Sequence, residues 1–267
     1  MSHLLRSHAP ISDDGWQMLD EEARERLSAA LGARKLVDFS GPHGWTYSAT
    51  NLGRTRGLDS SPSEGVTGRQ RVVLPVVELR ADFAVVREEL RDADRGAEDA
   101  DLEPLDAAAH QIAVAENVAV FHGWGEAIGG IASASPHGAA SLGDSAEQYP
   151  RRVAGAVEQL LCSGITGPYG LALGREQYRQ VVETAEHGGY PLLDHLRKIL
   201  EGGPIVWTPG VNGAVVLSLR GGDFLFESGQ DLSLGYDSHD ADVVRLYLEE
   251  SFSFRVATPE AAVALTA

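Results

Sequence analysis

Cysteine is almost absent from this sequence of 267 residues, which contains Cys162 and no other. One cysteine excludes an internal disulfide and any zinc site built from several thiolates, and it is typical of proteins kept in a reducing cytosol. The sequence also lacks an apolar run of about 20 residues, the length that a membrane-spanning helix needs. Residues 1–8 lack the basic region and apolar stretch of a secretory signal. These absences predict a soluble cytoplasmic protein.

Basic residues are also scarce. The chain has 22 lysines and arginines against 39 aspartates and glutamates, which gives a formal net charge of -17. Such a charge opposes binding to phosphate backbones and to anionic membrane surfaces. Nucleic acid and membranes are therefore not expected partners. The 43% of hydrophobic residues is nevertheless enough for a sizeable core.

Motifs of the common enzyme sites are missing as well. The sequence has no G-x-S-x-G, no Walker loop, no H-E-x-x-H and no strict G-x-G-x-x-G. The glycine-rich residues 123–130 follow a helical pattern, whereas a dinucleotide-binding turn follows a strand. The acidic stretch from Asp237 to Asp242 lacks the spacing of an EF-hand loop, which favours an acidic turn between strands. The sequence therefore predicts no catalytic residue and no metal site.

Two long helices are predicted from apolar spacing. Residues 12–31 carry apolar side chains every three or four positions behind Ser12, which is placed to cap a helix, and Gly32 ends the pattern. Residues 103–121 repeat this spacing until Gly123. A strand is predicted from the alternation in residues 79–85.

Residues 47–78 have few apolar side chains before Val72 and are rich in glycine, serine and arginine. The arginines are Arg54, Arg56, Arg69 and Arg71. A mobile surface loop is one interpretation, but more than 20 coreless residues within a compact domain are unusual and tend to be functional. We therefore predict an arm that becomes ordered against a neighbouring subunit.

Residues 133–149 show no apolar period, which suggests a crossover between domains. After them, the sequence predicts a mixture of helices and strands. The patterns predict helices near 153–161, 178–182 and 192–200, and strands at 171–173, 205–207 and 243–256. Residues 214–219 and 224–226 are predicted to form a hairpin, because Gly221 and Gly222 between them fit a type I′ turn.

Several short motifs, in constant order along the chain, carry a resemblance to a known family. They are His8-Ala9-Pro10-Ile11, Gly32-Ala33-Arg34-Lys35-Leu36-Val37-Asp38, Gly41-Pro42-His43-Gly44-Trp45, Phe121-His122-Gly123, Gly167-Pro168-Tyr169, Gly189-Tyr190-Pro191, Arg220-Gly221-Gly222-Asp223-Phe224, Gly229-Gln230-Asp231-Leu232-Ser233-Leu234-Gly235-Tyr236 and Glu250-Ser251-Phe252-Ser253-Phe254. In them the chain resembles the encapsulin nanocompartment shell proteins, family 1, a group that includes linocin and bacteriocin-type culture-filtrate proteins.

The resemblance implies an α+β fold of the phage major capsid type, known as the Hong Kong 97 type. It places an N-terminal helix and the start of a peripheral domain at 1–46, the E-loop arm at 47–78, the peripheral domain with its spine helix at 79–135 and the axial domain at 136–223. Residues 224–267 would be strands that return to the peripheral and axial domains.

The function implied is structural. Copies of the chain, most commonly 60 among relatives of this length, would close into an icosahedral shell around a cargo enzyme, a dye-decolorising peroxidase or a ferritin-like iron-storage protein. The chain itself would not be an enzyme. A phage capsid subunit, and a peptidase or bacteriocin, remain as alternatives, although no nucleophile and base pair supports the peptidase.

The resemblance also implies site residues. The residues expected to bind a cargo peptide are Arg34, Leu36, Asp38 and Leu234. The residues expected to line a pore on the fivefold axis are Glu183, Glu186, His187, Gly188, Gly189 and Tyr190. The arm that contacts other subunits carries Arg54, Arg56, Arg69 and Arg71. No cofactor is expected, because Glu88 stands where flavin-binding relatives have a tryptophan.

Overall fold

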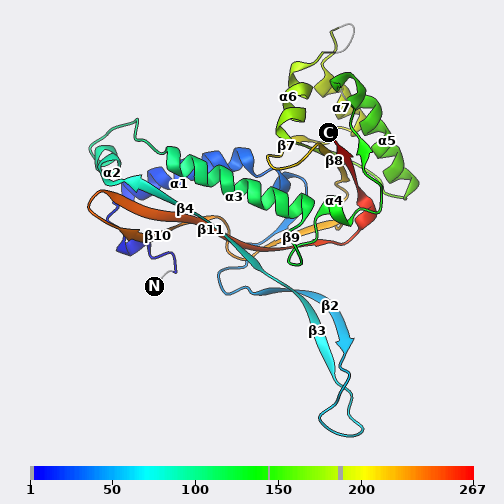
Figure 1. Ribbon diagram of the computed structural model, residues 1–267, viewed down its shortest axis with the longest axis horizontal. Coiled ribbons are helices and arrows are strands. Elements are labelled where there is room, and N and C mark those ends of the chain that lie inside the picture. The colour runs from blue at the N-terminus through cyan, green and yellow to red at the C-terminus, as the bar shows by residue number, and fades with distance from the viewer. Residues whose placement is uncertain (1–2, 144, 186–188) are drawn as a thin grey trace.

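The computed structural model in Figure 1 describes residues 3–143, 145–185 and 189–267. The chain forms two five-stranded sheets with helices packed against them, and a two-stranded hairpin extends away from both (Figure 1). Helices and strands neither separate into halves nor alternate regularly, so the fold class is α+β, as predicted.

The first sheet is centred on one long strand. Its members are β1 (Asp38–Ser40), β4 (Val77–Val86), β9 (Phe224–Ser228), β10 (Ser233–His239) and β11 (Val243–Val256). β11 pairs antiparallel with β4, β9 and β10, and β1 pairs parallel with β9. The alternation predicted for β4 is confirmed, because Ala81, Phe83 and Val85 are buried and the residues between them face outward.

Two long helices lie side by side along this sheet (Figure 1). They are α1 (Asp13–Ala30) and α3 (Glu103–His122), and shorter elements beside them are η1 (Arg6–His8), η2 (Ala33–Lys35) and α2 (Arg87–Asp94). The predicted cap of α1 is confirmed, since Ser12 Oγ accepts a hydrogen bond from Gly15 N at 2.9 Å. Among the helices that the structure describes, none has both the length and the apolar character required to cross a membrane.

The core of this part forms where α1, α3 and the sheet meet. Leu19 and Leu27 of α1 pack with Ile112 of α3 and with Leu246 and Leu248 of β11, all of them buried. The spacing of three and four residues in α1 therefore corresponds to one buried face, as the sequence predicts.

The second sheet has the order β5-β12-β8-β6-β7. Its strands are β5 (Ala140–Ser141), β6 (Tyr169–Leu173), β7 (Ile205–Trp207), β8 (Ala214–Ser218) and β12 (Ala262–Thr266). The elements around it are α4 (Ile131–Ala134), η3 (Ala146–Gln148), α5 (Tyr149–Cys162), α6 (Arg175–Glu183), α7 (Leu192–Ile199) and η4 (Pro259–Ala261). Every residue of β6 and β8 is buried, because other elements cover both faces of these central strands.

The hairpin predicted around Gly221 and Gly222 is wrong in its pairing. Both glycines have positive φ, as a type I′ turn requires, but β8 pairs with β6 and β12 while β9 pairs with β1 and β11. The turn instead carries the chain from the second sheet to the first. Asp38 Oδ2 accepts a hydrogen bond from Gly222 N at 2.7 Å, which fixes the turn against β1.

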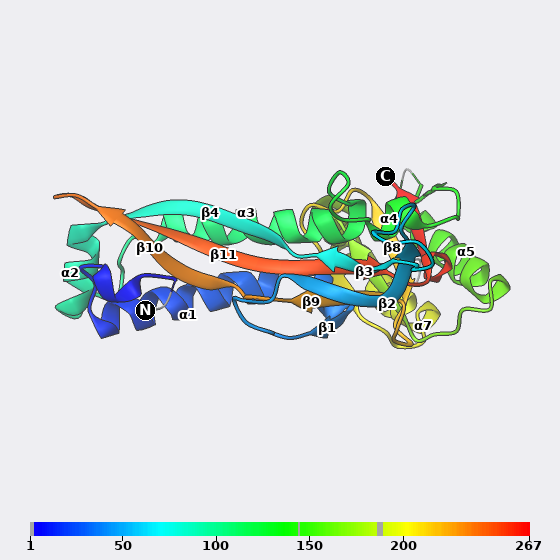
Figure 2. The same cartoon turned by 90° about the horizontal axis from the view of Figure 1, so that it is seen from below.

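The arm, residues 47–78, contains β2 (Ala49–Gly57) and β3 (Arg69–Pro75), which pair only with each other. The hairpin extends away from both sheets in Figure 1 and points toward the viewer in Figure 2. Most of its side chains are exposed and none is buried, and the exposed ones include Leu58 and Val66 at 52% and 55%. None of residues 49–75 belongs to either core. The absence of a core that the sequence indicates is therefore a property of the folded subunit.

Candidate functional site

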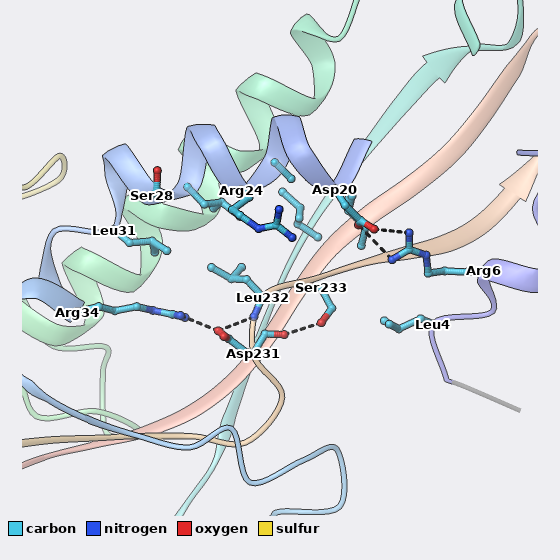
Figure 3. A pocket seen from close by; sticks show the side chains of 14 residues that line it. Leu4, Arg6, Asp20, Arg24, Ser28, Leu31, Arg34, Asp231, Leu232 and Ser233 are labelled. Atoms are coloured by element: carbon cyan, nitrogen blue, oxygen red, sulfur yellow. Dashed lines mark hydrogen bonds and ion pairs between the residues drawn. The ribbon is translucent and has the colours of Figure 1, made fainter. Parts of the chain in front are cut away.

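A pocket of about 460 Å³ lies between α1 and the chain entering β10 (Figure 3). We call it the α1 pocket. It is lined by Leu4, Arg6, Asp20, Ala23, Arg24, Leu27, Ser28, Leu31, Arg34, Asp231, Leu232, Ser233, Leu234 and Leu248. Leucines from four separate segments supply the apolar wall, and most of the polar side chains stand at its ends or on the exposed edge of α1.

Two ion pairs bound the α1 pocket at opposite ends (Figure 3). Arg6 and Asp20 are 2.7 Å apart at one end, and Arg34 and Asp231 are 2.6 Å apart at the other. The apolar wall between them fits a short segment with apolar side chains better than a compact polar metabolite.

The N-terminal segment completes the pocket. Leu4 O accepts a hydrogen bond from Tyr236 N at 2.9 Å, so this segment runs beside β10. The guanidinium of Arg6 lies 4.1 Å from the ring centroid of Trp16, which adds a cation–π contact to its ion pair with Asp20. Residues before α1 are therefore part of the pocket wall and are held there by contacts with α1 and β10.

Arg34 is held by three carboxylates, one on each of its side-chain nitrogens. Nε bonds Glu116 at 2.7 Å, Nη1 bonds Asp231 at 2.6 Å and Nη2 bonds Glu250 at 2.7 Å. Burial alone would lower the pKa of Arg34, but attraction to Glu116 and Glu250 outweighs it and raises this pKa. Arg34 is therefore always charged, and we call these four residues the Arg34 cluster.

The structure brings together only half of the residues predicted to bind a cargo peptide. Arg34 and Leu234 line the α1 pocket. Leu36 does not: it is 2% exposed and belongs to the core of the second sheet, against Gly170. Asp38 is absent from the pocket lining too, and its carboxylate binds the turn at Gly222. The partners of these two side chains, Gly170 and Gly222, are far away in the sequence, so the residues next to Leu36 and Asp38 do not reveal them.

Sequence reasoning missed Arg6, Arg24, Ser28 and Leu232 as lining residues. The sequence holds a signal for three of them. Arg24 and Ser28 follow Asp20 at intervals of four, so they share one flank of the predicted apolar stripe. Leu232 stands two residues before Leu234 and therefore on the same side of an extended chain.

The four arm arginines occupy both faces of the hairpin. Arg54 and Arg56 lie opposite Val72 and Gln70, whereas Arg69 and Arg71 lie opposite Gly57 and Thr55. Opposed residues share a face, so each face carries two arginines. Within the part of the chain that the structure describes, none of the four has an ionic partner.

The predicted pore residues that the structure describes lie at the end of α6 and just before α7. Glu183 ends α6, is exposed and lies 3.4 Å from Arg179. Gly189 has a φ of 81°, and the ring of Tyr190 lies 4.8 Å from Lys198 Nζ. Glu186, His187 and Gly188 lie outside the described residues. Glu88 is exposed on α2, and hydrogen bonds from Arg95 and Arg91 lower its pKa, so it presents a charge instead of a ring that could stack on flavin.

Comparison with known proteins gives a consistent result over the whole chain. The model of a family described as encapsulating protein for peroxidase matches residues 1–253. The type 1 encapsulin shell protein of Rhodospirillum rubrum is 47% identical over 271 residues, covering 99% of this chain and 96% of that protein. The type 1 encapsulin shell protein of Brevibacterium linens is 41% identical over 267 residues, with 100% of both chains covered.

Solved structures share the fold at much lower identity. A virus-like particle from Pyrococcus furiosus superposes with a TM-score of 0.64 at 20% identity, covering 93% of this chain and 98% of that one. The capsid of Myoviridae phage XM1 gives a TM-score of 0.51 at 12% identity, covering 88% and 90%. These likenesses confirm the predicted α+β capsid fold.

Proposed function

The chain belongs to the family of encapsulin shell proteins, and on this premise we propose that about 60 copies close into an icosahedral shell in the cytoplasm around a guest enzyme. The observation that carries the assembly step is the arm. An isolated two-stranded hairpin is at best marginally stable in water, and its two free edges are available for pairing with another chain. A hairpin that extends from the subunit without a core of its own is therefore a contact element for neighbouring copies.

A role as a phage capsid subunit is less well supported. The relatives that match at 41% and 47% identity are named encapsulin shell proteins, whereas the phage capsid shares the fold at 12% identity. The proposed function is therefore structural, and the chemistry belongs to the enclosed protein. A peroxidase is the first guest to test, because the family description names one. A ferritin-like iron-storage protein is the second.

We assign the α1 pocket to the guest. An apolar segment that buries two or three leucine or isoleucine side chains there would gain about 1.5–3 kcal/mol from each, before the cost of ordering the segment. Several linked guest subunits would add avidity. Arg34 and Leu234 remain in this assignment, while Leu36 and Asp38 are left out because of their positions in the fold.

The enclosure of a guest enzyme can be tested by whether the shell protects that enzyme from a protease. The chain is produced together with a peroxidase that carries a short apolar C-terminal extension, and particles are treated with a protease that is too large to enter a closed shell. We expect the guest to co-purify and to remain intact, while the same peroxidase without the extension does not co-purify. Digestion of a bound guest would show that no closed shell surrounds it.

We further propose that Glu183, with Gly189 and Tyr190 and the undescribed Glu186, His187 and Gly188, lines a pore between subunits. Rings of carboxylates favour cations over anions. Because Arg179 offsets part of the charge on Glu183, we expect Glu183→Gln to slow iron entry into loaded shells only about two- to threefold at low ionic strength. Glu158→Gln, an exposed substitution on α5, serves as the control. An unchanged rate in Glu183→Gln would remove this residue from the entry path.

A further inference from the structure

The Arg34 cluster contains more buried negative charge than its one guanidinium can balance. Glu116 of α3 and Glu250 of β11 are buried, with side-chain exposures of 0% and 1%, whereas Asp231 is 45% exposed. If both glutamates were ionised, the buried trio of Arg34, Glu116 and Glu250 would carry a net charge of -1. An uncompensated buried charge is costly in a folded protein.

The oxygen atoms of the two glutamates show the same imbalance. One oxygen of each carboxyl group, Oε2, accepts a hydrogen bond from Arg34. The other oxygen, Oε1, is buried in both residues and has no hydrogen-bond donor among the described residues. The two carboxyl groups are neighbours, because they bind the same guanidinium, Glu116 at Nε and Glu250 at Nη2. Two ionised carboxylates cannot form a hydrogen bond with each other, because neither has a proton to donate. A protonated carboxyl group can donate a hydrogen bond to an ionised neighbour.

We propose that Glu116 and Glu250 share one proton at neutral pH, and that this carboxyl pair positions Arg34 at the end of the α1 pocket. The shared proton reduces the charge of the buried trio to zero. It also supplies the missing donor between two buried carboxyl groups. Arg34 is then held by hydrogen bonds to α3 and β11 within a trio of zero net charge, and its remaining nitrogen, Nη1, binds Asp231 at the pocket.

The electrostatic surroundings favour protonation of Glu250. Burial raises the pKa of Glu250 well above its usual value of 4.5, and the neighbouring Glu116 raises it further against the opposing effect of Arg34. Burial also raises the pKa of Glu116, although the charge of Arg34 lowers it. Asp231 of the segment before β10 is the remaining charged group of the cluster, and its negative charge raises the pKa of Glu116.

The shared proton makes stability depend on pH with a definite sign. As pH rises above about 4.5, the unfolded chain releases this proton while the folded chain keeps it, so the free energy of unfolding falls until the raised pKa is reached. Glu250→Gln imitates the protonated form and has no proton to lose. The denaturation midpoint of the variant should therefore rise relative to that of the parent as the pH is raised from about 5 to neutral.

Infrared spectroscopy of assembled particles tests the proton directly and does not depend on any guest. We expect the parent at neutral pH to show the C=O stretch of a protonated carboxylic acid, and Glu250→Gln to lose it. Glu249→Gln, a substitution at the adjacent residue of β11, which pairs with His3, should keep the band. The inference is overturned if the parent lacks the band, or if the band survives in both Glu250→Gln and Glu116→Gln. Failure of a variant to fold leaves the parent spectrum decisive.

Discussion

A chain that lacks residues 54–70 is expected to fold but to form no shells. The deletion removes most of the β2–β3 hairpin, which contributes no side chain to either core. It keeps the base of the arm, where Thr50 Oγ1 and Ser253 Oγ are hydrogen bonded to each other. The deletion removes the outer strand edges of the hairpin together with Arg54, Arg56 and Arg69, and none of these three arginines has an ionic partner among the described residues. Its effect should therefore fall on contacts between subunits and leave the subunit itself intact.

Size-exclusion chromatography and circular dichroism together measure this outcome. We expect the deletion to move the protein from the void volume to the position of a monomer or small oligomer, with helix content unchanged. Replacing residues 59–64, the exposed connection beyond β2, by glycine and serine is the matched control, because it keeps both strands. Shells of parental size from the deletion variant would show that the arm is dispensable for assembly.

Leu232→Asp is expected to give closed shells that are nearly empty. Leu232 lines the α1 pocket and is only partly buried, so an aspartate there adds charge to the pocket without breaking the core. Loss of one apolar contact worth at least about 1.4 kcal/mol should reduce guest loading about tenfold or more. Leu234 would not serve for this test, because it is 2% exposed within β10 and a charge there would destabilise the subunit itself.

The control for this experiment is Leu161→Asp, which makes the same substitution at an exposed position of α5 outside the pocket. It should load the guest as the parent does. Loading is measured as the ratio of guest to shell protein in purified particles. Equal loading of Leu232→Asp and Leu161→Asp would place the guest elsewhere on the shell wall.

The long elements of the fold are predictable because their signals are local. The period of α1 and α3 and the alternation in β4 each arise from one buried face, and that face can be recognised within a single segment. The Gly221-Gly222 turn shows the limit of such signals. A local pattern identifies the turn, but competition from β12 and β6 for the edges of β8 decides which strands pair.

The site was less predictable because its contacts join remote segments. Arg34 was expected to face a peptide, but its partners Glu116, Asp231 and Glu250 lie 82, 197 and 216 residues away in the sequence. No spacing rule relates positions that far apart. Leu36 belongs to a matched motif and still lies in the core, because a family motif records positions that matter without separating packing from binding.

Sedimentation velocity of the purified chain, without any guest, tests the central claim most directly. At neutral pH and moderate salt, we predict one narrow boundary for a hollow particle of about 60 subunits, in the megadalton range, with little free 28.5 kDa chain. A boundary of a monomer or dimer under these conditions would contradict the account, because a folded subunit would then leave its arm unpaired and would not form a shell.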